Sequence, residues 1–321
     1  MSSKAWIPGM VAALASCAVL ADEQSVQQWF ERMQRAAHTQ NFEGVYVYSH
    51  NNQVNAMRIA QRVDSEGRRE KIESLDGSGG EVVATKARVS CRFPYNQSVV
   101  VETGAASGVL PSFPVQIRDL SQYYEFSLQG QGRVAGRPVQ RIAIRPRDEM
   151  RYGYHLWVDS HTGLLIKTEV IGPRHQTLEQ MRFVEIRYMS GASDESWSPA
   201  RAAHESIWRE TGVGGGGASG NESAWELGVL PAGYRLETHR TQNAVEGDQS
   251  TDHLVITDGL ASVSVFVEHG AAGHDDLLGG SSLGAVNAYG KVLNGYRVTA
   301  VGEAPQSAIR LISESFRLAG H

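Results

Sequence analysis

Residues 151–170, RYGYHLWVDSHTGLLIKTEV, predict a β-hairpin that organises the larger part of the chain. Two runs of β-branched, aromatic and aliphatic residues flank a polar turn at 159–163, and Gly163 stands where such a turn needs a positive φ. Side chains alternate along a strand, so pairing Val158 with Leu164 predicts one apolar face and one mixed face. The predicted apolar face consists of Tyr152, Tyr154, Leu156, Val158, Leu164, Ile166, Thr168 and Val170.

The segments around this hairpin predict a long antiparallel meander preceded by one helix. Apolar residues at helical spacing predict a helix over 25–37, and the Gly- and Pro-rich segment 104–121 predicts a loop with a short helix near 115–123. Elsewhere in this region, strand patterns and turn signals follow one another without further helices, which favours a meander. The predicted strands lie near 41–48, 54–63, 68–75, 81–86, 88–93, 97–102, 123–134, 138–146 and 176–188.

A smaller α+β domain is predicted at 225–321, after a segment at 193–224 that is rich in Ser, Ala and Gly. Four consecutive glycines at 214–217 predict a flexible linker, in which only 203–210 has the pattern of a short helical turn. Asp258-Gly259 predicts a two-residue hairpin turn. The other predicted elements are strands near 234–241, 251–257, 260–268, 282–289 and 291–301 and a helix over 305–318.

The first 21 residues predict a signal peptide. Lys4 precedes an apolar stretch that is too short to span a membrane, and small residues end it at Ala21. The large domain would then occupy 22–192, and the mature protein would be exported. A lipobox-like sequence ending in Cys17 leaves a second alternative open, in which the protein is anchored by a lipid on that cysteine.

Composition and motifs exclude several classes of function. The net charge is −5 and no basic stripe occurs, so we expect no nucleic-acid binding. The sequence contains no catalytic signature, so we expect no enzymatic activity and no cofactor. His269 and His274, with two aspartates after them, are the best metal ligands, but their glycine-rich surroundings favour a solvated loop and no metal is predicted. Cys91 is expected to be a buried hydrophobic residue.

Several phrases of the sequence resemble the MucB/RseB family of regulators. They are YHLWVDSHTGLLIKTEV at 154–170, NFEGVYVY at 41–48, LDG at 75–77 before Glu81-Val82, and Trp225 followed by LPAGY at 230–234. They occur in the family's order over nearly the whole mature chain. The resemblance implies that the large domain is a half-open β-barrel like that of the lipoprotein carriers LolA and LolB, with covering helices.

The resemblance also implies a function. Members of this family are periplasmic negative regulators of an envelope-stress sigma factor: they bind the periplasmic part of a membrane-anchored anti-sigma factor and shield it from proteolysis. They are expected to release it when lipid, lipopolysaccharide or lipoprotein acyl chains bind. The formation of a homo-oligomer is left as an open alternative. The residues that contact the partner are not predicted.

The apolar face of the large sheet has two interpretations. In the first interpretation, helices of the chain pack against this face and bury it as part of the hydrophobic core. In the second, the same helices form a lid over a site that binds an acyl chain. For the second case the predicted ligand-binding residues are Tyr154, Leu156, Val158, Leu164 and Ile166. The alternative function on the same fold is a periplasmic lipoprotein or lipid carrier of the LolA type, although simple carriers of that fold lack a second domain.

Overall fold

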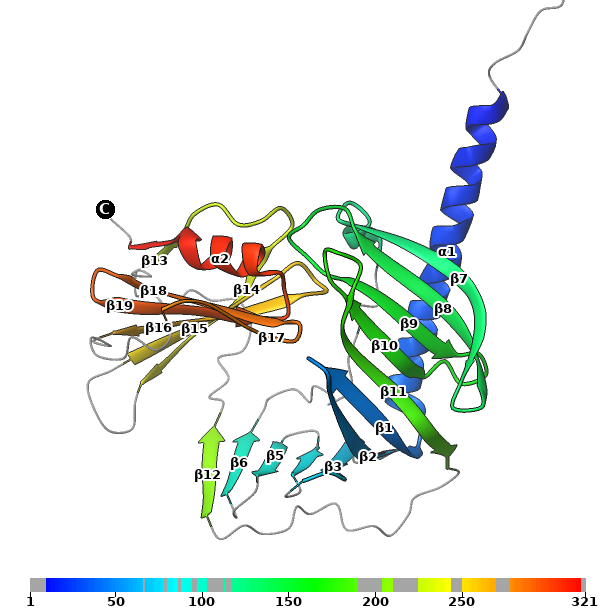
Figure 1. Cartoon of the computed structure of the whole chain (residues 1–321), viewed down its shortest axis with the longest axis horizontal. Helices are drawn as coiled ribbons and strands as arrows, with labels where there is room; N and C mark the ends of the chain where they lie inside the picture. Colours follow the sequence, from blue (N-terminus) through cyan, green and yellow to red (C-terminus); the bar gives the residue numbers. More distant parts are fainter. Residues whose placement is uncertain are drawn as a thin grey trace, which may run out of the picture.

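The computed structural model describes residues 10–65, 67–77, 80–85, 88–93, 97–102, 113, 117–189, 204–209, 225–243, 250–269 and 278–318. In this part of the chain, two β-sheet domains lie side by side (Figure 1). The large domain holds a 12-stranded sheet, and the small domain holds a 6-stranded sheet and a separate two-stranded pair.

The sheet of the large domain is open and mainly antiparallel. Its strand order is β12-β6-β5-β4-β3-β2-β1-β11-β10-β9-β8-β7, so β7 and β12 are its two edges and the sheet is not closed into a barrel. Among the strands that the structure describes, only β12 runs parallel to its neighbour, β6. The predicted mainly antiparallel, half-open fold is therefore confirmed. The strands are β1 (Phe42–His50), β2 (Gln53–Asp64), β3 (Gly67–Ser74), β4 (Glu81–Ala84), β5 (Arg88–Phe93), β6 (Gln97–Glu102), β7 (Tyr124–Val134), β8 (Arg137–Pro146), β9 (Gly153–Asp159), β10 (Leu165–Ile171), β11 (Thr177–Tyr188) and β12 (His204–Arg209).

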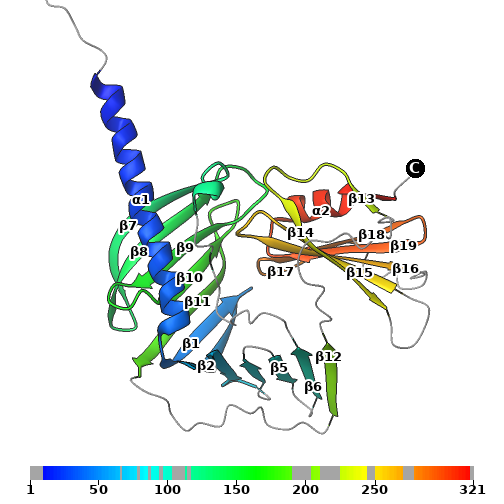
Figure 2. The same cartoon turned by 180° about the vertical axis from the view of Figure 1, so that it is seen from behind.

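Helix α1 (Met10–Thr39) crosses one face of strands β7 to β11 (Figure 2). It buries Val26, Phe30 and Met33 in a cluster with side chains of β7, β8 and β9, as the helical spacing of these residues predicts. The helix predicted over 25–37 is thus confirmed, and it continues back to Met10. In the described part of the chain, no helix combines the length and the apolar character needed to cross a membrane.

Strands β9 and β10 form the predicted hairpin, with Gly163 at a φ of +81°. The predicted register is wrong: a bulge opposes Val158 to Leu165 rather than to Leu164, and Leu156 lies opposite Thr168. Over most of the hairpin the register differs by two residues, which is an even number and keeps side chains on their face. Tyr154, opposite Val170, and Leu156 therefore retain the predicted face.

The small domain packs helix α2 (Gln306–Ser315) against its sheet. In the large domain, a short 3-10 helix, η2 (Arg118–Leu120), lies in the loop where a short helix was predicted. Strand order in the small domain is β14-β15-β16-β19-β18-β17, and β13 pairs with β20. The elements are β13 (Trp225–Leu227), β14 (Arg235–Asn243), β15 (Ser250–Thr257), β16 (Ser262–His269), β17 (Gly279–Leu283), β18 (Val286–Leu293), β19 (Tyr296–Gly302), α2 (Gln306–Ser315) and β20 (Phe316–Leu318).

Three turns of this domain differ from the prediction. Thr257 pairs with Ser262, so the hairpin loop is 258–261 rather than Asp258-Gly259 alone. The Asp258 carboxylate accepts hydrogen bonds from the backbone N–H of residues 260 and 261, which holds the longer loop. The strands predicted at 282–289 and 291–301 are interrupted by turns at Gly284 and at Asn294-Gly295, all with positive φ.

Other expectations concern the segment between the domains and residues outside the described part. Within the segment predicted as a linker, 204–209 forms strand β12, so the predicted helical turn there is wrong. The glycines at 214–217 and His274 lie outside the described residues, as do the side chains of Cys17 and Cys91.

Candidate functional site

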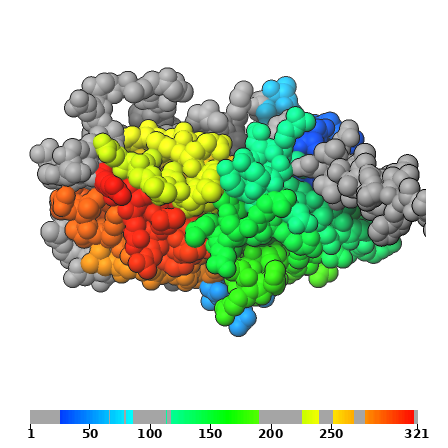
Figure 3. Space-filling view, turned by 90° about the horizontal axis from the view of Figure 1, so that it is seen from above, coloured from blue at the N-terminus to red at the C-terminus, as the bar shows by residue number. Residues whose placement is uncertain are grey.

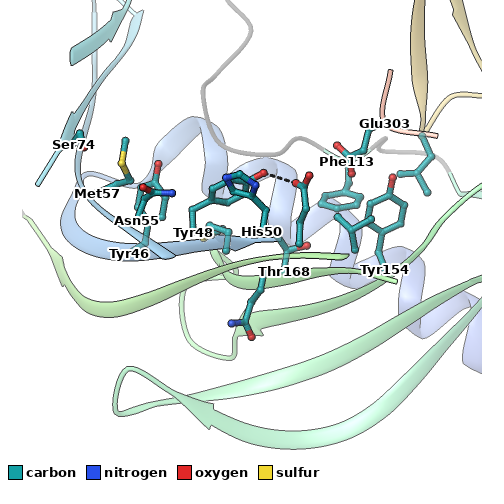
Figure 4. Close-up of a pocket in the computed structure, with 15 residues that line it drawn as sticks. Tyr46, Tyr48, His50, Asn55, Met57, Ser74, Phe113, Tyr154, Thr168 and Glu303 are labelled. Atoms are coloured by element: carbon teal, nitrogen blue, oxygen red, sulfur yellow. Dashed lines mark hydrogen bonds between the residues drawn. The ribbon is translucent and has the colours of Figure 1, made fainter. Parts of the chain in front are cut away.

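A cavity of about 630 Å³ lies between the large-domain sheet and the small domain (Figure 4). The large domain supplies most of the wall, from β1, β2, β3, β9, β10 and β11, whereas Leu260 and Glu303 come from the small domain. The lining residues are Tyr46, Tyr48, His50, Asn55, Met57, Ser74, Phe113, Tyr154, Thr168, Val170, Glu179, Gln180, Met181, Leu260 and Glu303.

Phe113 lies between this cavity and helix α1. Its ring packs edge-on against Phe30 of α1, with 6.2 Å between ring centroids, and against Tyr154 of β9, at 5.7 Å. The side-chain amide of Gln34 donates a hydrogen bond to the Phe113 carbonyl oxygen at 2.7 Å. Helix α1 therefore fills one part of the sheet's inner face as core, and the cavity occupies a part that the helix leaves uncovered.

Glu179 of β11 links both domains at the cavity wall. Its side chain is 9% exposed and accepts a hydrogen bond from the Tyr48 hydroxyl. Its other oxygen accepts one from the backbone N–H of Ala285, in the small domain, at 2.8 Å. A carboxylate of the large sheet is thus satisfied in part by the neighbouring domain, which makes the local wall depend on how the domains are docked.

Glu303 enters the cavity from the residues that join β19 to α2. Burial and the nearby Glu179 carboxylate raise the pKa of Glu303 to about 7. Burial also raises the pKa of Tyr154, with Glu303 as a second cause, and burial raises the pKa of Tyr46 to about 12. Two acids, one from each domain, therefore lie at the wall of the cavity.

A fully buried ion pair joins the domains beside the cavity. Nη1 of Arg151 lies 2.7 Å from Oδ2 of Asp258, and neither side chain is exposed to solvent. The Tyr124 hydroxyl donates a hydrogen bond to the same oxygen at 2.8 Å. The Asn287 amide donates one to the Tyr152 hydroxyl, also at 2.8 Å. Three tyrosine rings also surround the Arg151 guanidinium. The distances from Cζ of Arg151 to the ring centroids of Tyr123, Tyr124 and Tyr234 are 4.7, 5.4 and 5.3 Å, respectively.

Of the residues predicted to bind an acyl chain, only Tyr154 lines the cavity. Leu156 and Val158 are fully buried in the cluster that contains α1. Leu164 and Ile166 are buried in a neighbouring cluster that includes Ala36 of the same helix, with Phe42 and Phe183. Ligand binding by this set stays a prediction, and the chain itself covers four of its members.

Sequence reasoning missed Glu179, Glu303 and Tyr48. Strand alternation carried a signal for one of them, because it places Glu179 on the same face as Met181 and Phe183, where an acid is unusual. No comparable pattern marks Glu303. In the described part of the chain, no group of three His, Cys, Asp or Glu side chains is arranged to hold a metal ion.

Comparison with curated proteins finds regulators of sigma factors. The chain is 32% identical over 302 residues to the sigma factor AlgU regulatory protein MucB of Pseudomonas aeruginosa, and the match covers 90% of each chain. It is 26% identical over 310 residues to the sigma-E factor regulatory protein RseB of Haemophilus influenzae, with 94% of each chain covered. These relatives are named as regulatory proteins and not as enzymes, as expected for this chain.

Solved structures of MucB have the same two-domain fold. A crystal structure of MucB in complex with MucA(peri) matches 92% of this chain and 99% of that chain, with a TM-score of 0.67 and 27% identity. The complex structure of Pseudomonas aeruginosa MucA/MucB matches 92% of this chain and 100% of that chain, with a TM-score of 0.69 and 25% identity.

Two family models together cover most of the sequence. Residues 25–201 match the MucB/RseB N-terminal domain, and residues 219–317 match the MucB/RseB C-terminal domain. The resemblance seen in the sequence phrases is thereby confirmed: the chain belongs to the MucB/RseB family.

Proposed function

We propose that this protein is a periplasmic negative regulator of an envelope-stress sigma factor. It binds the periplasmic part of a membrane-anchored anti-sigma factor and shields that partner from proteolysis. It releases the partner when the acyl chain of a lipid, lipopolysaccharide or lipoprotein occupies the cavity between its domains. The names of the relatives and the MucB structures that contain MucA(peri) support a partner of this kind.

The observation that carries this proposal is the composition of the cavity wall. Aromatic and aliphatic side chains of the large domain line it together with Leu260 and Glu303 of the small domain. A ligand that enters there meets both domains, so its binding energy depends on their relative arrangement. A ligand can release a partner only when it binds two arrangements differently, and an interdomain site provides that difference.

Protection from proteolysis tests the proposal. The partner is first captured from envelope extracts with the mature protein, and its periplasmic fragment is then purified and digested with a protease. We expect the fragment to be cleaved more slowly in the presence of this protein, and faster again after a neutral alkyl amphiphile is added. Unchanged cleavage would contradict the regulatory function, whereas bound acyl chains without any protein partner would support the LolA-type carrier.

The proposal also requires export. We expect the purified mature protein to begin at Asp22, after removal of 1–21. Its intact mass and N-terminal sequence, measured on protein from the periplasmic fraction, test this expectation. A diacylated N-terminus at Cys17 would instead place the protein on a membrane surface.

A further inference from the structure

Three turns of the small domain meet the large domain through glycine backbone. They contain Gly233, Gly259 and Gly284, each with a positive φ. A Cβ added at Gly284 would lie 2.5 Å from Oε1 of Glu179, and a Cβ added at Gly233 would overlap the Tyr123 ring. The third position has slightly more room, with 3.2 Å to the nearest side chain of the large domain. The two domains are therefore docked so closely that a methyl group at Gly233 or Gly284 would displace a side chain of the large domain.

One end of this interface, the buried corner, consists of Tyr124, Arg151 and Asp258. The Arg151 guanidinium also donates a hydrogen bond to the Ala232 carbonyl oxygen at 2.5 Å, and the Tyr234 hydroxyl donates one to the Met150 carbonyl oxygen at 3.1 Å. Asp258 lies in the loop between β15 and β16, which are inner strands of the small sheet. Separation at the buried corner would break a dry ion pair and three hydrogen bonds together.

The other end is the hairpin tip, residues 284–287, where β17 turns into β18 beside the large domain (Figure 1). The backbone N–H of Ala285 donates to Glu179, and the Asn287 amide donates to the Tyr152 hydroxyl, both at 2.8 Å. Neither hydrogen bond is part of an ion pair. Strand β17 is an edge of the small sheet, and all five of its residues are exposed. The hairpin tip is therefore held by fewer polar contacts than the buried corner and lies at the outer edge of its sheet.

The two ends also differ in their relation to the cavity. Glu179, which holds the hairpin tip, lines the cavity together with Tyr48, its other hydrogen-bond partner. The three residues of the buried corner are not among the lining residues. A molecule in the cavity can therefore compete for the contact between Glu179 and the hairpin tip, whereas the ion pair of the buried corner stays out of its reach.

We propose that the interface opens at the hairpin tip while the buried corner stays closed, so that the small domain rotates about the corner and the cavity widens beside Glu179. This inference rests on the proposed function, because the closed and open arrangements are the two states between which the ligand and the partner select. A ligand that fills the widened cavity binds the open arrangement more tightly and increases its population. A partner that is released by this ligand prefers the closed arrangement.

Position 284 gives a selective way to open the hairpin tip. Gly284→Ala places a methyl group against Oε1 of Glu179 and displaces this oxygen from the N–H of Ala285. Gly295→Ala is the matched control in the same domain, because Gly295 has a φ of +85° and nothing within 4 Å of an added Cβ. Both variants add strain in the same backbone region, but only Gly284→Ala disturbs the large domain. Glu179→Ala is a second test variant, which removes the acceptor without backbone strain.

Distances between two spin labels, measured by electron paramagnetic resonance on the mature protein without ligand, report the opening. A first pair at Val184 and Leu283 spans the end of the interface at the hairpin tip. A second pair at Gln122 and Val229 spans the end at the buried corner. All four side chains are exposed, and the labels are attached to cysteines introduced in a Cys91→Ser background.

The first pair should move to longer distances in Gly284→Ala and in Glu179→Ala, while the second pair keeps its distance. Gly295→Ala should leave both distances as they are in the wild-type protein. Octyl glucoside, a neutral alkyl amphiphile, is expected to bind Gly284→Ala roughly tenfold more tightly than the wild-type protein, a factor that corresponds to about one hydrogen bond. The reason is that the apparent affinity increases with the populated fraction of the arrangement that the ligand binds. Titration calorimetry below the critical micelle concentration measures this affinity.

The outcomes separate this inference from the proposed function. Longer distances in both pairs would show that the domains separate as a whole, and unchanged distances in both test variants, folded by thermal unfolding, would show that the hairpin tip does not open. Either result overturns the inference. A longer first distance with an unchanged affinity for octyl glucoside would overturn the coupling between the opening and the cavity. A longer first distance without any binding of octyl glucoside would support the opening and contradict the ligand-sensing part of the proposed function.

Discussion

Arg151 in the large domain and Asp258 in the small domain form an ion pair in which both side chains are completely buried, with 2.7 Å between Nη1 and Oδ2. Arg151 is the first residue of the organising hairpin segment, and Asp258 begins the loop between β15 and β16. Figure 3 shows that the two domains are in broad contact when seen from above. The pair therefore joins the two folding units at a point that excludes water.

Substitution of Arg151 should strongly lower the free energy of unfolding. Arg151→Met leaves the Asp258 carboxylate buried without its counter-ion, and breaking a buried pair in this way costs about 3–5 kcal/mol. The free energy of unfolding, measured in urea, is expected to fall by that amount. The control is Arg310→Met, which removes an exposed pair with Glu314 and should change stability by about 1 kcal/mol or less. Equal effects of the two substitutions would contradict the structural role of the Arg151 pair.

The turn of the organising hairpin should tolerate no side chain at position 163. Gly163 has a φ of +81°, and a Cβ there would lie 2.9 Å from the Arg32 carbonyl oxygen of α1. Gly163→Ala is therefore expected to lower the free energy of unfolding through backbone strain and through displacement of the helix. Gly136→Ala is the matched control, since Gly136 has a φ of +74° and nothing within 4 Å of an added Cβ.

The control isolates strain alone, which costs about 1–2 kcal/mol for an L-residue in this region. The loss in Gly163→Ala should exceed the loss in Gly136→Ala when both are measured by urea unfolding. A loss no larger than that of the control would mean that helix α1 does not pack closely against the turn at Gly163.

The inner face of the hairpin should behave as core at Leu156. This side chain is fully buried in the cluster that contains Phe30 of α1. Leu156→Ala is expected to reduce the free energy of unfolding by about 2–5 kcal/mol, the usual cost of a core cavity. Val184→Ala, at a position 52% exposed on β11, should change it by less than about 0.5 kcal/mol. Unchanged stability in Leu156→Ala would contradict its burial beneath the helix.

Stability should depend on pH through Glu303. Its pKa is raised from 4.5 to about 7 in the folded protein, so the folded state binds more protons than the unfolded state between these values. The contribution of Glu303 to stability is therefore full below about pH 4.5 and is lost as the pH rises through 7, by on the order of 3 kcal/mol.

Urea unfolding of the wild-type protein and of Glu303→Gln, across about pH 5 to 8, measures this effect. The variant cannot ionise, so its stability relative to the wild-type protein should increase as the pH rises. A difference that is constant over the whole range would show that the Glu303 carboxyl is not shifted.

Much of the fold follows from local patterns in the sequence. Period-two alternation predicted β1 to β11, and helical spacing predicted the part of α1 that contacts the sheet. The Asn294-Gly295 turn also had a recognisable signal, since Asn-Gly is a preferred hairpin turn, but the continuous apolar pattern around it predicted a single strand. Local pattern and turn chemistry competed there, and the turn determined the structure.

The candidate site was far less predictable because its residues meet only through tertiary structure. Glu179 and Glu303 are brought together by the docking of two domains, and their separation along the chain gives no sign of it. The bulge that opposes Val158 to Leu165 was likewise not predicted by the alternation of apolar residues along the hairpin. Strand alternation predicted which face is apolar, but not how much of that face α1 covers.

The coupling between the cavity and the partner is tested most directly by the affinity of the anti-sigma fragment at increasing concentrations of an amphiphile that binds the cavity. Reciprocal linkage requires that saturation with the amphiphile weaken fragment binding by the same factor by which the fragment weakens amphiphile binding. We predict a loss of at least about fivefold, the lower end of typical allosteric coupling. An unchanged fragment affinity at saturating amphiphile would contradict release through this cavity.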